Sequence, residues 1–214
     1  MLEEFRRIGE LMFREGLVDS HGGNMSIKKD DKIYITRRNA MLGDLKENDI
    51  VEGDDENASR EIIVHRAIYK ETKALAIVHT HSASAIAVSI TDNKIIPQDS
   101  EGQYLYKSAA IVRAHQSIGS EEVARLLPTF LQPPNVVAVV KGHGAFAIGE
   151  NLEEAYKYAS SLENSCKVLI AIRSSGGQKP QVPPPRDNVR RQPDHRRSAI
   201  PPGIGVMDRS RYKR

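Results

Sequence analysis

The sequence is poor in the residues that build cross-linked or strongly aromatic proteins. It has one cysteine, Cys166, and no tryptophan, and aromatic residues make up 5% of its 214 residues. A single thiol cannot form an internal disulfide, which excludes a secreted disulfide scaffold. Because aromatic side chains are few, we expect a mainly aliphatic core, and the length is sufficient for one domain with a sizeable core.

Long apolar runs are also missing. No stretch approaches the roughly 18 consecutive apolar residues of a membrane span, and the N-terminal segment MLEEFRRIGELMF carries charge throughout, unlike a signal peptide. Hydrophobic residues make up 39% and charged residues 28% of the chain, as in ordinary globular proteins. These features predict a cytoplasmic enzyme or binding protein without a membrane partner.

Most of the chain has no excess of positive charge. The net charge of +3 comes from residues 174–214, which hold ten Lys and Arg against three Asp and Glu, whereas residues 1–173 hold 21 against 25. Nothing basic in the larger part suggests a nucleic-acid partner. Seven of the eleven prolines also lie beyond residue 173. We therefore expect a folded domain over residues 1–173 and a flexible Pro/Arg-rich C-terminal tail over residues 174–214.

Apolar periodicity predicts an α/β fold. A hairpin is expected around residues 29–31, and its presence indicates a mixed or antiparallel sheet layered with helices. Ser59 and Ser120 are expected to cap two of the helices. Apolar spacing predicts helices over residues 2–15, 60–70, 82–89, 119–127 and 152–172, and buried strands over residues 74–78 and 136–140.

Three histidines follow the two buried strands. His79 and His81 are two residues apart, so in an extended chain their imidazoles point to the same side. His143 follows the next strand and is flanked by glycines that let the backbone come close. Three imidazoles with an open fourth position are typical of a catalytic metal site. The alternative is an incidental pair of core histidines, but the glycine-flanked third histidine favours the metal.

Glu61 is the candidate acid or base, because it begins a helix that returns to the strand before His79. Its position alone favours the simpler interpretation, an acidic residue in a first helical turn. His65 lies one turn further along and is either a fourth ligand or, more simply, a polar packing residue.

Several residues are suited to an anion. The Gly22-Gly23-Asn24 loop offers backbone N–H groups and an amide. Arg37, Arg38 and Arg60 carry the fork-shaped group that suits phosphate or carboxylate. For any one arginine, a solvated surface charge is the simpler alternative.

Five segments in order resemble the class II aldolase and adducin family over about residues 1–173. They are GGNMSI, ITRRN, ASREIIVH, AIVHTHSASAIAVS and VVKGHGAFAIGENLEEAYKYASSLE. The resemblance implies a three-layer α/β/α fold around a mostly antiparallel sheet. It also implies a homotetramer with active sites between subunits.

The resemblance further implies Zn²⁺, or another divalent transition metal, on His79, His81 and His143, with Glu61 as the catalytic carboxylate. The reaction would be reversible retro-aldol cleavage of a small ketose 1-phosphate, such as fuculose 1-phosphate. The products would be dihydroxyacetone phosphate and an aldehyde such as lactaldehyde, with the metal polarising the ketone.

The anion-binding half of the site departs from the family pattern. Gly23 and Asn24 are retained, but the usual T-P-S/T-G loop reads Thr36-Arg37-Arg38-Asn39 and the usual S-S-E reads Ser59-Arg60-Glu61. The substrate-binding residues implied here are Gly23, Asn24, Arg38, Asn39, Ser59 and Arg60. Both departures introduce arginine, so either guanidinium groups hold the phosphate or the anion is different.

Family aldolases also use tyrosines as acids, one from the neighbouring subunit and one from the C-terminal tail. The first falls near Glu101, with Tyr104 and Tyr106 close by, and the second corresponds to Tyr212, the only tyrosine in the tail. Glu101 and Tyr212 are therefore the expected acids.

Other members of the family suggest two further functions. A sugar-phosphate 4-epimerase or a methylthioribulose-phosphate dehydratase would use the same three histidines with a different second acid. A non-catalytic module like the adducin head is less consistent with the chain, because it has no need of an open metal site with Glu61.

Overall fold

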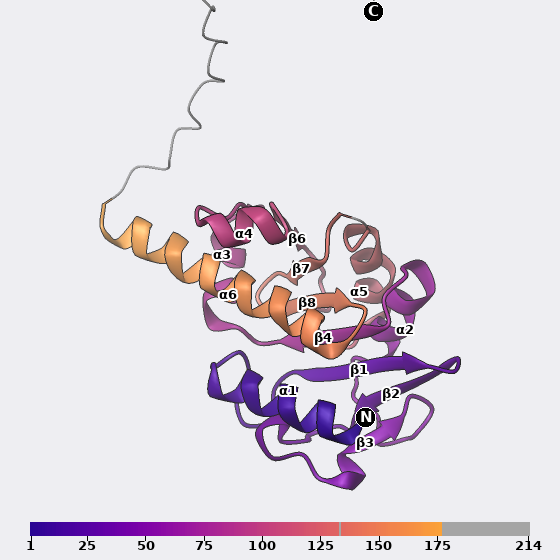
Figure 1. Ribbon diagram of the computed structural model, residues 1–214. Coiled ribbons are helices and arrows are strands. Elements are labelled where there is room, and N and C mark those ends of the chain that lie inside the picture. The colour runs from indigo at the N-terminus through magenta and orange to yellow at the C-terminus, as the bar shows by residue number, and fades with distance from the viewer. Residues whose placement is uncertain (133, 177–214) are drawn as a thin grey trace, which may run out of the picture. The chain divides into compact units, whose positions relative to one another are not determined.

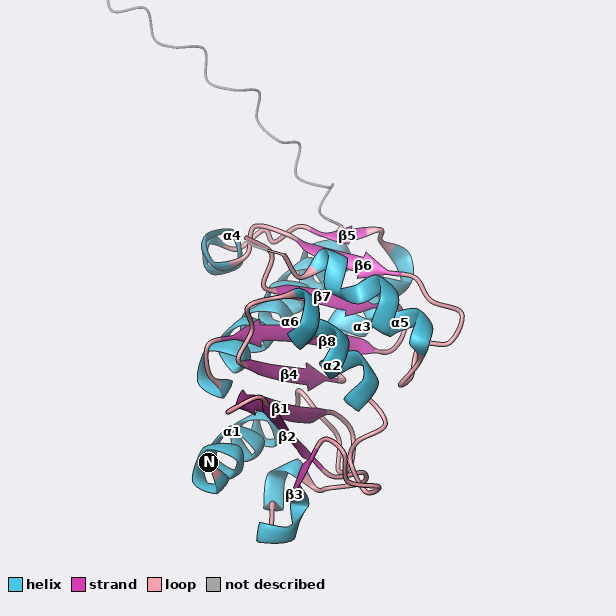
Figure 2. Cartoon of the chain, turned by 90° about the vertical axis from the view of Figure 1, so that its right-hand side faces the viewer, coloured by secondary structure: helices cyan, strands magenta, loops and turns pink. Residues whose placement is uncertain are grey.

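One eight-stranded sheet organises the protein. The computed structural model describes residues 1–132 and 134–176, and the strands lie in the order β3-β2-β1-β4-β8-β7-β6-β5 (Figure 2). Neighbouring strands are antiparallel except β6 and β7, which are parallel. The expected mostly antiparallel sheet is confirmed. The strands are β1 (Asn24–Lys29), β2 (Lys32–Thr36), β3 (Ile50–Glu52), β4 (Ala76–Thr80), β5 (Lys94–Ile95), β6 (Ala109–Val112), β7 (Val137–Val140) and β8 (Gly144–Gly149).

Helices cover both faces of this sheet. The helices are α1 (Leu2–Arg14), α2 (Ile62–Glu71), α3 (Ala83–Thr91), α4 (Ser100–Leu105), α5 (Glu121–Leu126) and α6 (Leu152–Ser174), with 3-10 turns η1 (Leu42–Asp44), η2 (Glu47–Asp49) and η3 (Leu127–Phe130). One apolar core joins α1, α3 and α6 to the sheet, and a second joins α2, α5 and η3 to its other face. In Figure 1, α6 lies across the central strands β8 and β4. The three-layer α/β/α arrangement is confirmed.

The central strand β4 is buried on both faces. Ala76 and Val78 belong to the core under α6, whereas Ile77 belongs to the core under α2. Because side chains alternate along a strand, His79 points to the same face as Ile77. A strand covered on both faces has no polar side, so its sequence is a continuous apolar run.

Some element boundaries differ from those expected. Helix α2 begins at Ile62, after Glu61 at the N-cap position, so the expectation that Ser59 caps a helix from Arg60 is wrong. A backbone bridge between Arg37 and Ala58 keeps the chain extended up to this point. Strand β4 extends through His79 and Thr80, beyond the expected end.

Other expectations are met at the ends of helices. The Ser120 hydroxyl accepts the Val123 N–H, which confirms it as the cap of α5. Helix α6 extends one residue beyond the expected domain boundary at Arg173. The expected tail, including Tyr212, lies outside the described residues. In the part of the chain that the structure describes, no helix is long and apolar enough to cross a membrane.

Candidate metal centre and active site

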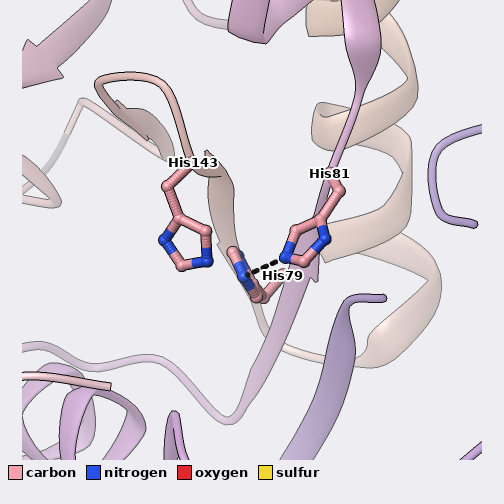
Figure 3. A group of neighbouring side chains, drawn as sticks. All are labelled: His79, His81 and His143. Carbon is pink, nitrogen blue, oxygen red and sulfur yellow. Dashed lines mark hydrogen bonds between the residues drawn. The ribbon is translucent and has the colours of Figure 1, made fainter. Parts of the chain in front are cut away.

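Three imidazoles meet at one end of the sheet. Strand β4 pairs with β8 through Thr80 and Ala145, and β7 pairs with β8 through Val140 and Gly144. The turn from β7 to β8 therefore lies beside the end of β4, and His143 on that turn faces His79 and His81 (Figure 3). The Nε2 atoms of His79 and His81 are 3.1 Å apart. One ring nitrogen from each of the three lies within 4.8 Å of the others.

Glycines permit this close approach, as their positions beside the histidines suggested. A side chain at Gly144 would place its Cβ 2.1 Å from the Thr80 carbonyl oxygen and 3.1 Å from the His79 ring. A Cβ at Gly22 would lie 2.7 Å from Nδ1 of His81. Any side chain at either position would clash with its neighbours, so only glycine lets the backbone lie this close to the imidazoles.

The imidazoles are set up as neutral ligands. The His79 Nδ1–H donates to the Ala145 carbonyl oxygen at 3.0 Å, which leaves the lone pair on Nε2. Burial lowers the pKa of His79 well below its usual range, with the neighbouring histidines adding to the effect. Burial also lowers the pKa of His81, and burial with the nearby His81 lowers the pKa of His143 to about 4. All three rings are uncharged at pH 7.

These residues fit a divalent transition metal. A tetrahedral ion with metal–nitrogen bonds of about 2.0–2.1 Å separates its ligand atoms by roughly 3.3 Å, close to the 3.1 Å between His79 and His81. Three imidazoles leave a fourth position for a substrate or water, which distinguishes catalytic from structural sites. The donor set suits zinc, copper, iron or nickel better than magnesium or calcium.

The carboxyl group of Glu61 lies against this centre. Its side chain is 5% exposed, and its Oε1 lies 3.7 Å from Nε2 of His143. Oε1 also accepts the Gly119 N–H at 2.7 Å, whereas Oε2 has no hydrogen-bond partner among the described residues. A buried carboxylate beside three imidazoles, with one oxygen free, is better suited to proton transfer than to capping a helix.

Burial raises the pKa of Glu61 to about 7, and the Gly119 hydrogen bond opposes the rise. Because the pKa of His143 is lowered, this pair is not an ion pair at neutral pH. A bound cation would lower the pKa of Glu61 by its own charge. A carboxyl group that titrates near neutrality is able both to take and to return a proton.

His65 packs behind the centre and does not join the three histidines. It is fully buried, and its Nδ1 lies 2.7 Å from the Ser26 hydroxyl, which lies 2.7 Å from the Tyr69 hydroxyl. Burial lowers the pKa of His65 to about 3. These contacts favour the packing role over the fourth-ligand role.

Gly23 and Asn24 lie directly beside the histidines. Gly23 has a φ of +73°, and a Cβ there would lie 2.7 Å from the His79 carbonyl oxygen. Asn24 pairs with His79 across β1 and β4, and its Oδ1 is buried with no hydrogen-bond partner among the described residues. An amide in this condition is available to a ligand.

The two arginine-bearing segments lie side by side. The Arg38 N–H donates to the Asn57 carbonyl oxygen at 2.7 Å, and the guanidinium group of Arg38 donates to the backbone carbonyl oxygen of Glu56 at 3.3 Å. Ser59 is buried and Arg60 is exposed, while Asn39 adopts a φ of +58°. Arg37 pairs instead with the buried Asp49 at 2.6 Å.

Glu101 lies apart from the histidines within one chain. It is exposed on α4 and lines a cavity of about 1030 Å³ with residues of α6 such as Lys157 and Asn164, and none of the three histidines lines that cavity. Nearby, Tyr104 is 83% exposed and Tyr106 is buried. Tyr212 lies outside the described residues.

Two contacts of the site were not foreseen. Gly119 was expected at a helix start, yet its N–H binds Glu61 from the loop before α5. Phe146 stacks on His79 with ring centroids 4.0 Å apart, but its strand β8 was not predicted. The positive φ of +50° at Gly119 is a geometry that glycine favours, so the glycine itself was the available signal.

The chain is similar to known proteins over nearly all of its described part. Residues 3–170 match the model of the Class II Aldolase and Adducin N-terminal domain. An L-fuculose phosphate aldolase of Methanococcus vannielii is 32% identical over 180 residues, covering 81% of this chain and 97% of that protein. A methylthioribulose-1-phosphate dehydratase of Acidiphilium cryptum is 29% identical, covering 75% of this chain and 85% of that protein.

A solved structure agrees with these relatives. The L-fuculose-1-phosphate aldolase of Thermus thermophilus superposes with a TM-score of 0.79 at 32% identity, covering 85% of this chain and 98% of that one. The family and the fuculose-phosphate aldolases among these relatives support a lyase of the aldolase type. The chain belongs to the class II aldolase and adducin family.

Proposed function

We propose that this protein is a metal-dependent aldolase that reversibly cleaves a small ketose 1-phosphate, of the fuculose 1-phosphate kind, into dihydroxyacetone phosphate and an aldehyde such as lactaldehyde. The observation that carries the proposal is the convergence of three neutral imidazoles beside the buried carboxyl group of Glu61. Aldolases that are 31–32% identical supply the substrate class.

His79, His81 and His143 would hold the metal, and zinc is the favoured ion for three imidazoles with an open position. When bound, the ion supplies Lewis acidity that polarises a substrate carbonyl group. The hydrogen bond from His79 to Ala145 keeps the His79 ring in the tautomer and orientation that ligation needs.

Glu61 is the proposed acid and base at the reacting carbon. In the cleavage direction the bond between C3 and C4 breaks, the C4 hydroxyl loses its proton, and C4 becomes the aldehyde carbon. The electron pair of the broken bond stays with the C3 fragment, where Glu61 delivers a proton to C3. In the synthetic direction the same carboxylate removes that proton.

The acid or base for the C4 hydroxyl is proposed to come from outside the three-histidine cluster. Glu101 and Tyr212 remain the candidates. Because Glu101 lies away from the histidines in its own chain, its participation requires a neighbouring subunit, which accords with a homotetramer. Sedimentation velocity would test this point, and a monomer that is fully active would exclude Glu101.

The phosphate group is proposed to bind beside Gly23, Asn24, Arg38, Asn39, Ser59 and Arg60. Asn24 pairs with His79 across β1 and β4, so this set of residues adjoins the three histidines. The hydrogen bond from the Arg38 N–H to the Asn57 carbonyl oxygen holds the two arginine-bearing segments next to each other.

The substitution Glu61→Gln tests the central assignment. We expect metal content, measured by elemental analysis, to stay near that of the unaltered protein, while turnover of fuculose 1-phosphate falls by about 10²–10⁴-fold. The amide keeps the size and the hydrogen bond to Gly119 but cannot carry the proton. Unaltered protein without any divalent metal, or a variant of normal turnover, would refute the proposal.

A second candidate function is water elimination, because one relative is named as a methylthioribulose-1-phosphate dehydratase. Incubation with dihydroxyacetone phosphate and a panel of aldehydes separates the two functions. A new ketose phosphate supports the aldolase. Absence of condensation with every aldehyde, together with dehydration of methylthioribulose 1-phosphate, would support the dehydratase instead, and reversal of configuration at C4 of a ketose phosphate would support an epimerase.

Arg38→Ala tests the anion site. We expect the KM for the phosphorylated substrate to rise by about 10-fold or more, since an exposed guanidinium group is lost from the proposed phosphate contact. The matched control is Arg14→Ala, an exposed arginine of α1 that pairs with Glu10. Equal KM values for the two variants would remove Arg38 from the site.

A further inference from the structure

The two ends of helix α3 are joined to the segments that carry two of the three histidines. Its first residue, Ala83, comes two positions after His81. Near its other end, the Ser89 hydroxyl accepts the N–H of Gly142, the neighbour of His143, at 3.0 Å. The helix therefore connects the end of β4 with the turn between β7 and β8.

The start of α3 is held by a residue of another helix. Ser82 occupies the N-cap position but makes no capping bond, because its hydroxyl donates to the Thr80 hydroxyl at 2.9 Å. Instead, the two carboxylate oxygens of Glu163 on α6 accept the N–H groups of Ser84 at 3.2 Å and Ala85 at 3.0 Å. A carboxylate on two N–H groups of a helix start is a charge-assisted clamp.

Glu163 is unusual in being an acidic residue inside the core, with 2% exposure. Its nearest cation is Lys167, at 3.9 Å and itself half exposed. A buried carboxylate is costly unless its hydrogen bonds repay the lost hydration. The two N–H groups of α3 supply these hydrogen bonds, so the helix start and Glu163 stabilise one another.

Ser89 holds the other end of the connection. It is fully buried, donates to the Ile86 carbonyl oxygen at 2.6 Å, and accepts the Gly142 N–H. Gly142 has a φ of +71°, a conformation that glycine adopts without strain. The Ser89 hydroxyl thus satisfies a backbone donor of the turn that carries His143.

We propose that α3 is a rigid spacer between His81 and His143, and that Glu163 and Ser89 are positioning residues that set the separation of these imidazoles and so the affinity for the metal. The inference rests on the proposed metal site. Residues that orient metal ligands contribute about 10–100-fold to affinity when they are removed.

The test measures affinity for Zn²⁺ on the demetallated full chain, by competition with a chromogenic chelator. We expect the dissociation constant to rise about 10-fold in Glu163→Gln, which keeps one acceptor, and further in Glu163→Ala. Ser89→Ala, a smaller change, is expected to weaken binding in the same direction. Co²⁺ substitution adds a spectroscopic signature, because altered ligand positions shift its visible absorption bands.

Two control variants remove similar contacts between the α1 and α6 segments, which do not involve α3. Glu4→Gln weakens the carboxylate of α1 that accepts the Leu152 N–H at the start of α6, and Ser160→Ala removes a hydroxyl that donates to Glu15. Urea unfolding of each demetallated variant measures its stability. We expect the controls to lose comparable stability yet keep the Zn²⁺ affinity and the Co²⁺ spectrum of the unaltered protein.

The outcomes separate this inference from the function on which it rests. If the unaltered chain binds no Zn²⁺ or Co²⁺, the proposed function fails. If it binds them and the Glu163 and Ser89 variants bind as tightly as the controls, only the spacer role is overturned. Should Glu163→Ala fail to fold, Ser89→Ala and Glu163→Gln still decide the question.

Discussion

Gly144 is the residue with the least room for change at the histidine centre. Its missing side chain leaves space for the Thr80 carbonyl oxygen and the His79 ring. The Gly142-His143-Gly144 pattern was readable in the sequence, but the close approach follows from the pairing of β4 with β8. A glycine is informative at such a place only when its neighbours across the sheet are known.

Gly144→Ala is expected to lower the free energy of unfolding by about 1–3 kcal/mol, the usual cost of forcing extra atoms into a packed region. It should also weaken Zn²⁺ binding, because pushing β8 away from β4 moves His143, on the turn before β8, relative to His79 on β4. Urea unfolding and chelator competition measure the two effects. In the control Gly16→Ala, the Cβ meets no atom within 4 Å at a φ of +74°, so only backbone strain of about 1 kcal/mol is expected. Unchanged metal affinity in Gly144→Ala would show that the strand accommodates the methyl group.

At the scale of elements, the sequence predicted helices and strands best where one apolar helix face or one long apolar run determines the structure. The apolar face of α1 includes Phe5, Ile8 and Met12, all buried as their spacing indicated. Strand β8 was missed because its sequence GAFAIG is short, is buried on both faces, and does not alternate between apolar and polar residues. Strands β3, β5 and β6 and helix α4 were missed too, each short and stabilised by partners distant in sequence.

The loop before α5 depends on the cap of that helix. Ser120 accepts the Val123 N–H at 3.1 Å, and the adjacent Gly119 donates to Glu61. We expect Ser120→Ala to reduce stability by about 1 kcal/mol and to reduce turnover as well, because the donor to Glu61 loses its anchor. Asn151→Ala is the matched control, since Asn151 caps α6 by accepting the Glu154 N–H at 2.9 Å. Stability should fall in both variants, and an equal fall in turnover would contradict the link to Glu61.

At the scale of the whole molecule, the layered fold and the gathering of the histidines were predictable through the resemblance of five ordered segments. The residues themselves left His143 and Glu61 open to simpler explanations. What periodicity cannot supply is strand order, because the pairings of β4 with β1 and β8 join residues far apart in the chain. That order decides which residues surround His79, including Asn24 and Phe146.

The same long-range packing buries His65, and this has a consequence for stability against acid. Its folded-state pKa of about 3 lies below the value of 6.5 for a solvated histidine. Between these values the unfolded chain binds a proton that the folded chain does not. The free energy of unfolding therefore falls as the pH falls through this window, by up to about 1.4 kcal/mol per pH unit for this one group. Above pH 6.5 the contribution is complete and constant.

His65→Gln tests this argument, because glutamine retains a polar side chain but does not titrate. The other buried histidines are common to both proteins, so the difference between the two unfolding free energies isolates His65. From pH 6 to pH 4 the unaltered protein should lose about 2 kcal/mol more than the variant, measured by urea unfolding of demetallated samples. Parallel curves for the unaltered protein and His65→Gln would mean that His65 becomes protonated without unfolding, for which the Ser26 and Tyr69 hydroxyls beside its ring would have to reorganise.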